Sequence, residues 1–154
     1  MENFVLSCCS TADLSLEHFQ NRNIHYICFH YELNGTVYPD DLGQSMPFDV
    51  FYEAMTKGAE TKTFQVNVAE FEAYFETFLQ EGKDILHLSF SSGLSGTCNS
   101  MKIAAEELQE EYPERKIIVI DTLCACLGEA LLLYYVLKQK ENGATIEEAA
   151  KWAE

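Results

Sequence analysis

The sequence predicts an α/β fold with an open, mostly parallel sheet flanked by helices, and with a β-hairpin near residues 24–38. From residue 84 onward, apolar strand patterns alternate with helix patterns, which is typical of right-handed crossover units. Residues 116–121, KIIVID, form a continuous apolar run of the kind that is buried on both faces of a parallel sheet. Two capping-box patterns, at residues 67–70 and 145–148, mark the starts of helices.

The first segments predict a strand, a turn and a helix. Residues 3–9, NFVLSCC, indicate a short buried strand, and residues 10–15, STADLS, a turn that opens a helix. Ser10 or Thr11 would cap that helix. The side chains expected to face inward are Leu14, Leu16 and Phe19.

The next segments predict the hairpin and a helix. Residues 24–33, IHYICFHYEL, are rich in β-forming residues and indicate one strand. Asn34-Gly35 is a strong hairpin signal, with the return through TVY. Residues 39–55 hold a loop and then a helix, with Pro47 at its first position.

The remaining elements alternate regularly. One apolar helix face after Asn67 consists of Phe71, Tyr74, Phe75, Phe78 and Leu79. Residues 84–90, DILHLSF, indicate a strand, and the next helix buries Met101, Ala104, Ala105 and Leu108 while its glutamates face water. The helix at 127–140 is apolar almost all round, so it is either central or covered by another surface, and Asn142-Gly143 ends it.

Composition limits the function classes. The 154 residues carry a net charge of −15, which disfavours nucleic-acid and membrane-surface partners. No apolar run is long enough to span a membrane, and the N-terminus lacks a secretory pattern. We therefore expect a cytoplasmic protein in which the six cysteines are reduced.

The segment FSSGLSGTCNS, residues 90–100, is the main candidate site. It follows a strand and opens a helix, the place where ligands collect in parallel sheets. Gly93 and Gly96 allow close approach of the backbone, and Ser92, Ser95 and Thr97 supply neutral donors. With the first amides of a helix beginning near Ser95, these groups suit a small anion such as a carboxylate or phosphate. An ordinary capped turn is the competing interpretation.

Other chemistry has weaker support. The turn is neither a P-loop nor a G-x-S-x-G elbow, and His87, the nearest histidine in sequence, is interpreted as a core or edge residue. Cys124 and Cys126 do not complete a zinc site, so we expect buried thiols and no metal. Asp121 is interpreted as a capping and hydrogen-bonding residue, and Asp40-Asp41 as a solvated loop.

SSGLSGT, together with TADL near the start, KTFQVN in the middle and VIDT later, resembles the DegV family of bacterial fatty-acid-binding proteins. The resemblance runs through the whole chain. It implies a non-enzymatic carrier, with a long-chain fatty acid lying between an N-terminal α/β domain and a second domain. Residues 1–154 would be the N-terminal domain, with the second domain absent. It further implies that some members present the acid to a fatty-acid kinase for phospholipid synthesis.

The resemblance also assigns residues. The hydroxyl-bearing and glycine positions that would hold the carboxylate are Thr63, Ser91, Ser92, Ser95, Gly96 and Thr97, with Ser10, Thr11 and Asp121 in support. The bound acid is the ligand, and no cofactor is implied. The sequence departs from the family pattern at Cys9, Phe64, Val66 and Thr122, which replace aspartate, serine, proline and serine.

Two other functions stay open. A small α/β enzyme, either a hydrolase or a phosphoryl-transfer enzyme, would use residues 90–100 as its anion site and needs a base within reach of Ser92 or Ser95. An interaction module that has lost lipid binding would use its apolar face for self-association. A missing second domain or a homo-oligomer would cover the apolar face of LLLYYVL, residues 131–137.

Overall fold

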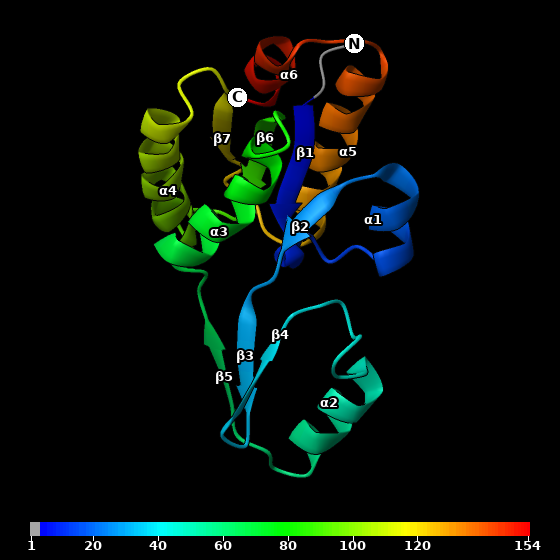
Figure 1. Ribbon diagram of the computed structural model, residues 1–154. Coiled ribbons are helices and arrows are strands. Elements are labelled where there is room, and N and C mark those ends of the chain that lie inside the picture. The colour runs from blue at the N-terminus through cyan, green and yellow to red at the C-terminus, as the bar shows by residue number, and fades with distance from the viewer. Residues whose placement is uncertain (1–3) are drawn as a thin grey trace.

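Four parallel strands form the central sheet of the computed structural model, which describes residues 4–154 (Figure 1). Their order is β2–β1–β6–β7, with bounds His25–Ile27, Phe4–Cys9, Asp84–Ser89 and Ile117–Asp121. β1 pairs with β6 from Phe4↔Asp84 to Cys8↔Leu88. The predicted α/β class with an open parallel sheet is therefore confirmed.

Helices cover both faces of this sheet. α1 (Leu16–Arg22), α5 (Leu127–Glu141) and α6 (Ile146–Ala153) cover one face, and α3 (Val68–Leu79) and α4 (Thr97–Glu111) cover the other. Side chains alternate across a strand, and β1 shows the result. Leu6 and Cys8 enter the cluster under α5 and α6, while Val5 and Cys9 enter the cluster under α3 and α4.

A smaller lobe projects from the carboxyl edge of the sheet (Figure 1). It holds the antiparallel sheet β4–β3–β5, with bounds Thr36–Pro39, His30–Leu33 and Thr61–Phe64, and the helix α2 (Phe48–Thr56). The predicted hairpin is confirmed, since Leu33 pairs with Thr36 across Asn34 and Gly35. Both turn residues have positive φ, 50° and 83°, as a type I′ turn requires.

The prediction of one strand over residues 24–33 is wrong. β2 ends at Ile27, where it pairs with Cys9, and β3 begins at His30 in the other sheet. The chain crosses between the lobes at Phe29, whose N–H donates to Ser10 Oγ at 3.1 Å and whose carbonyl accepts from Asp40 N at 2.7 Å. These two bonds satisfy the backbone where no sheet partner exists.

Three further expectations need correction. Ser15, not Ser10 or Thr11, caps α1, because residues 10–12 form a separate 3₁₀ turn, η1 (Ser10–Ala12). Residues 61–64 form β5, a strand that the sequence analysis did not assign. The helix after the serine-rich turn begins at Thr97, with Gly96 as its cap, rather than near Ser95.

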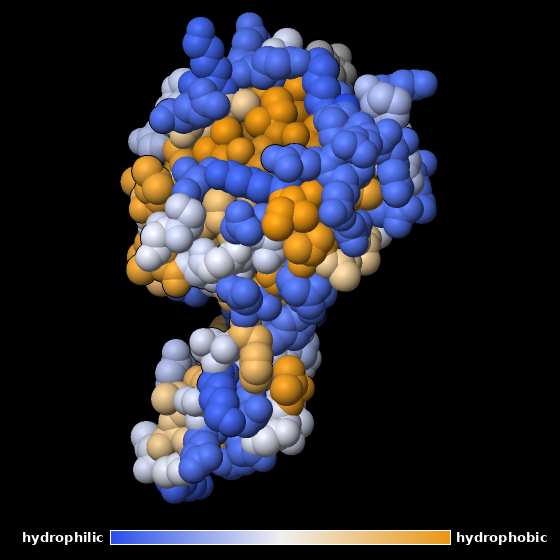
Figure 2. All heavy atoms as spheres, turned by 90° about the vertical axis from the view of Figure 1, so that its left-hand side faces the viewer, coloured by the Kyte–Doolittle hydropathy of each residue, from blue (hydrophilic) through white to orange (hydrophobic). Residues whose placement is uncertain are grey.

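β7 is apolar but is not buried on both faces, because it is the edge strand of the sheet. Ile117, Ile118 and Val119 are each partly exposed. On the side that carries α4, Figure 2 shows hydrophobic atoms in a hollow framed by hydrophilic side chains. A groove of about 540 Å³ lies there between β7 and α4.

Other sequence signals are confirmed. Asn67 with Glu70 and Thr145 with Glu148 form complete capping boxes. On the predicted apolar face of α3, Phe71, Phe75, Phe78 and Leu79 are buried, and Tyr74 is partly buried. The predicted helix after the loop is present as α2, but Pro47 is its N-cap and Phe48, not Pro47, is the first helical residue.

A buried polar network lies inside the sheet beneath α3. Ser7 Oγ lies 2.7 Å from Tyr74 Oη and 2.9 Å from His87 Nδ1. His87 Nε2 lies 3.7 Å from Cys9 Sγ, and the rings of Phe71 and Phe75 flank the imidazole. Burial lowers the pKa of His87 from 6.5 to about 3, so it is a neutral core histidine, as expected.

This network predicts acid sensitivity with a definite sign. The unfolded chain protonates His87 below pH 6.5 and the folded chain does so only near pH 3, so His87 lowers stability as pH falls between these values. We expect His87→Gln to be less stable than wild type at pH 6.5. The difference in unfolding free energy should shrink by about 2 kcal/mol on moving to pH 5. Urea unfolding at both pH values measures it, and a constant difference would contradict the assignment.

Candidate functional site

The serine-rich turn joins β6 to α4 at the carboxyl edge of the sheet. Ser91 is buried, and its hydroxyl accepts from Gly93 N–H at 3.2 Å. Leu94 and Ser95 donate their N–H groups to the carbonyl of Ser91. Ser91 is therefore engaged within the turn, while Ser92 at its tip is exposed.

The hydroxyls at the start of α4 pair with each other. Ser95 Oγ accepts from Thr97 N–H at 3.2 Å and lies 2.9 Å from Thr97 Oγ1. Thr97 is fully buried. Gly96 packs against Gln65, because a Cβ at position 96 would lie 2.7 Å from Gln65 Oε1. Gln65 directly follows β5, so the serine-rich turn and the small lobe meet here.

A second turn, at residues 121–126, supports the first. Asp121 Oδ1 accepts from the N–H groups of Ser92 and Leu123, each at 3.1 Å. Ser91 N–H donates to the carbonyl of Cys124 at 3.0 Å. Partial burial raises the pKa of Asp121, but the bonds from Ser92 and Leu123 outweigh it and the pKa is lowered. The expected hydrogen-bonding role of Asp121 is what the structure shows.

The two turns present polar and apolar groups side by side. Leu94 and Leu123 are 67% and 74% exposed, and Leu127 at the start of α5 is also exposed. Leu123 and Cys126 have positive φ, 53° and 52°, which is unusual for residues other than glycine. Backbone strain of this kind clusters at functional sites. This surface therefore suits a ligand with a polar head and an apolar tail.

Thr63 and Thr11 lie at a different part of the same region. Both line a cavity of about 290 Å³ between η1 and the small lobe, which none of the residues 91–97 lines. The apolar lining consists of Phe29, Tyr31, Pro39, Met46, Phe48, Phe51 and Tyr52. Asp13, Asp40 and Asp41 also line it. The predicted site residues therefore form two groups, one at the serine-rich turn and one at this cavity.

The turn η1 connects the cavity to the large lobe. Ser10 Oγ accepts from Phe29 N–H, and Thr11 Oγ1 lies 3.0 Å from Glu129 Oε2. Glu129 is fully buried and was not identified in the sequence analysis, where it appears as an ordinary first-turn acid in LGEALLL. Burial raises the pKa of Glu129 to about 8.

The expectation of two buried thiols is wrong for Cys126, which is exposed, whereas Cys124 is half-buried. Position 126 directly precedes α5 and its positive φ turns the side chain toward Asp13, whose bond to the thiol raises the pKa of Cys126. Among residues 4–154, no group of three or more histidine, cysteine or acidic side chains could hold a metal ion.

The hydrolase interpretation needs a general base beside Ser92 or Ser95, and the group bonded to Ser92 is the carboxylate of Asp121 rather than a histidine. Within the described part of the chain, no hydrogen bond joins a histidine to Ser92 or Ser95. His87 is fully buried and bonded to Ser7 and Cys9. A serine nucleophile requires a base within about 3 Å.

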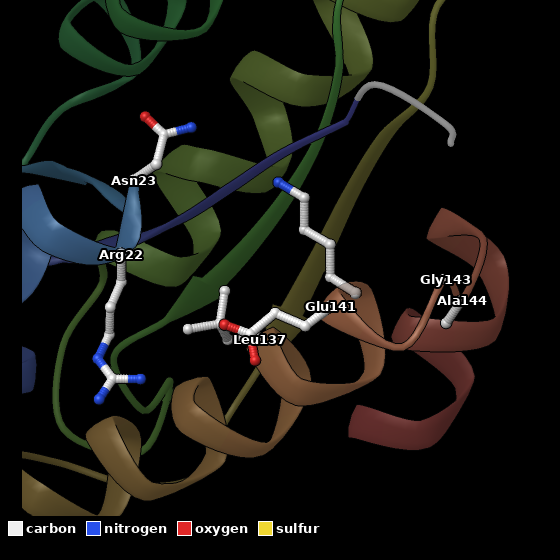
Figure 3. A pocket seen from close by; sticks show the side chains of 7 residues that line it. Arg22, Asn23, Leu137, Glu141, Gly143 and Ala144 are labelled. Carbon is white, nitrogen blue, oxygen red and sulfur yellow. The ribbon is translucent and has the colours of Figure 1, made fainter.

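A cleft of about 220 Å³ lies at the opposite end of the large lobe (Figure 3). Arg22 and Asn23 at the end of α1, Leu137 and Glu141 in α5, and the turn at residues 143–144 surround it. The strands begin at this end, and ligands of open parallel sheets bind at the other. The serine-rich turn remains the better candidate.

Comparison with known proteins gives a consistent picture. A sequence model described as "Uncharacterised protein, DegV family" matches residues 9–154. A DegV domain-containing protein of Clostridium perfringens is 39% identical over all 154 residues, which cover 53% of that relative. The chain thus spans about half the length of the curated relatives it matches.

Solved structures agree. A stearic-acid-binding protein from Eubacterium ventriosum is 25% identical, with a TM-score of 0.87 over 97% of this chain and 52% of its own. A DegV lipid-binding protein from Thermotoga maritima is 30% identical, with a TM-score of 0.84 over 99% of this chain and 53% of its own. Within residues 4–154, no helix is long and apolar enough to cross a bilayer.

We expect Asp121→Ala to loosen both turns, because one carboxylate oxygen holds the N–H groups of Ser92 and Leu123. Amide hydrogen exchange at these two residues should accelerate about tenfold, the effect of losing a partly solvated bond to a charged group. Glu106→Ala, an exposed acid on α4, is the control. Unchanged exchange at both amides would show that the turns do not depend on Asp121.

Proposed function

The chain belongs to the DegV family, and on that premise we propose that it is a carrier that binds a long-chain fatty acid by its carboxylate. The observation that carries the proposal is the amphipathic surface of the two turns. The Ser92 side chain is exposed beside Leu94 and Leu123, so a hydroxyl group and apolar surface adjoin.

At the serine-rich turn, positive potential from Lys102 and from the N-terminus of α4 offsets the negative charge of the Asp121 carboxylate. One carboxylate oxygen of Asp121 accepts hydrogen bonds from the N–H groups of Ser92 and Leu123. Lys102 on α4 is near enough to lower the pKa of Asp121. The dipole of α4 adds positive potential at Thr97. A carboxylate held at this turn would accept a hydrogen bond from the Ser92 hydroxyl, and the family resemblance assigns a second hydroxyl to Thr63, which lines the neighbouring cavity.

The acyl tail would need more apolar wall than these residues supply. The cavity beside Thr63 measures about 290 Å³, at the lower limit for small-molecule pockets. We therefore propose that residues 1–154 act as an N-terminal α/β domain, and that a second domain or a second copy completes the tunnel. Presentation of the bound acid to a fatty-acid kinase rests on the family resemblance alone and stays a prediction.

We expect Ser92→Ala and Thr63→Ala each to weaken fatty-acid binding without unfolding the protein, since both side chains are exposed. A hydroxyl bonded to a carboxylate contributes about 1.5–3 kcal/mol, so each affinity should fall at least tenfold. Calorimetric titration with a soluble fatty-acid analogue measures this. Thr61→Ala, two residues earlier on β5, is the matched control.

Unchanged affinity in both variants would place the head group elsewhere. Denaturing mass spectrometry of lipid extracted from gently purified protein tests the ligand class separately. A long-chain acid at near-equimolar yield would support the carrier, and turnover of an ester or phosphoryl substrate that Ser92→Ala abolishes would favour the enzyme.

The outer face of α5 predicts self-association. Leu127, Leu131 and Tyr135 recur every four residues and are exposed, and Trp152 of α6 lies against Tyr135 with ring centroids 5.9 Å apart. Apolar patches of this kind usually mark interfaces.

We expect the protein to associate and to bind apolar dyes, and to bind fatty acid weakly or only as an oligomer that completes the pocket. Leu131→Lys should reduce association, whereas Ile103→Lys, at a partly exposed apolar residue of α4, should not. Light scattering and calorimetry measure both. A strictly monomeric protein that binds fatty acid at nanomolar affinity would show that no second wall is needed.

A further inference from the structure

Glu129 is a buried carboxyl group with two partners, both at the end of β1. Its side chain is fully buried in the first turn of α5. Oε1 accepts from Cys9 N–H at 3.3 Å, and Oε2 lies 3.0 Å from Thr11 Oγ1. Burying an acid is costly unless it is hydrogen-bonded or neutral. Here one carboxyl group ties α5 to the turn η1.

The turn η1 in turn reaches the candidate ligand cavity. Thr11 lines the cavity together with Thr63, and its neighbour Ser10 bonds the backbone where the chain crosses to the small lobe. A shift of Glu129 would therefore move a residue that lines the cavity. The hydrogen bond between Glu129 and Thr11 thus connects a residue buried in the core to a residue of the cavity wall.

We propose that Glu129 is a positioning residue for the ligand site: as a neutral acid it donates a hydrogen bond to Thr11 Oγ1, which frees the Thr11 hydroxyl to donate to an anionic head group in the cavity that Thr11 and Thr63 line. This inference rests on the proposed function. The proton stays on Glu129, and no covalent bond changes. When Glu129 ionises, its oxygen becomes the acceptor, the Thr11 hydroxyl turns toward it, and the ligand loses a donor and faces a negative charge.

The surroundings favour the neutral acid near neutral pH. Burial raises the pKa of Glu129 to about 8; the bonds from Thr11 and Cys9 lower it, and the Asp13 charge raises it. The groups that face Glu129 are Cys8 and Cys9 of β1, Asp13 after η1, and Cys126 before α5. The pKa values of the three thiols are raised, the first two chiefly by burial and the third chiefly by its bond to Asp13, so these thiols stay neutral while Glu129 titrates.

Amide NMR signals test the positioning role without any ligand. In the wild-type protein the signals of Thr11 and Cys9 should shift together between pH 6 and 9.5, with a midpoint near 8. Glu129→Gln should abolish this transition, whereas Glu17→Gln, an exposed acid in the first turn of α1, should keep it. Signals that do not titrate in the wild type, or that titrate equally in Glu129→Gln, would overturn the proposal.

Stability gives a second readout with a worked sign. The unfolded chain releases the Glu129 proton near pH 4.5 and the folded chain near pH 8, so the wild type loses stability as pH rises between these values. The ratio of the wild-type to the Glu129→Gln folding equilibrium constant should fall by about tenfold per pH unit in that range. A ratio independent of pH would show that Glu129 ionises normally in the folded protein.

Affinity for a fluorescent long-chain fatty-acid analogue at pH 7 and pH 9 tests the coupling to the ligand. We expect the wild type to bind about tenfold more weakly at pH 9, the effect of losing one hydrogen bond to a charged group. Glu129→Gln should change less than about twofold, because its amide donates to Thr11 at both pH values. Equal pH dependence in both proteins would overturn the coupling. Absence of binding at every pH, with the Thr11 signal still titrating, would refute the proposed function and the ligand step but support the positioning of η1.

Discussion

The pairing of β1 with β6 is the constraint on which the rest of the structure depends. The two strands run parallel in register from Phe4↔Asp84 to Cys8↔Leu88, at the centre of the sheet. Parallel pairing forces η1, the serine-rich turn and the turn after β7 to leave the same edge. Segments that lie far apart in sequence, at residues 10–12, 91–97 and 121–126, therefore become neighbours. On the other side of β6, its parallel pairing with β7 places Ser89 opposite Asp121, and this lets Asp121 bond Ser92.

Two buried polar groups that contact these strands, one on β6 and one on α5, respond to protons in opposite ways. His87 projects from β6 to one face of the sheet and is kept neutral by burial, so acid opposes the fold there. Glu129 lies on the other face, against the end of β1, and is also kept neutral, so base opposes the fold there. Between pH 4.5 and 6.5 the two effects have opposite signs and offset each other. The sheet thus tolerates buried polar groups because each is neutral and each is hydrogen-bonded.

The sequence predicted structure correctly where the stabilising interactions join residues that are close in sequence. Asn34-Gly35, Asn67 with Glu70, and Thr145 with Glu148 act within a few residues, and each formed the turn or cap expected. The sequence of residues 24–33 did not show that two strands lie there, since Cys28 and Phe29 are common in strands. The passage between the two lobes is fixed by the bonds that Phe29 makes with Ser10 and Asp40, which are distant from the segment's own pattern. The serine-rich turn was identifiable, but the engagement of Ser91, Ser95 and Thr97 within it depends on turn geometry. Glu129 was missed because the segment against which it is buried, at residues 9–11, is distant in sequence, and the local pattern LGEALLL contains no signal of that burial.

The small lobe enters and leaves the large lobe at adjacent points. The chain departs after β2 and returns at Val66, and the strands that lead out and back pair directly, with His30 opposite Phe64. Leu42 packs on the large-lobe core, but every pairing of the parallel sheet lies outside this excursion. Such a segment has the topology of an insertion, in which closely spaced ends place little demand on the host fold. The length of this excursion can therefore change with little disturbance to the parallel sheet, so the shape of the small lobe and the folding of the large lobe are separable properties of the chain.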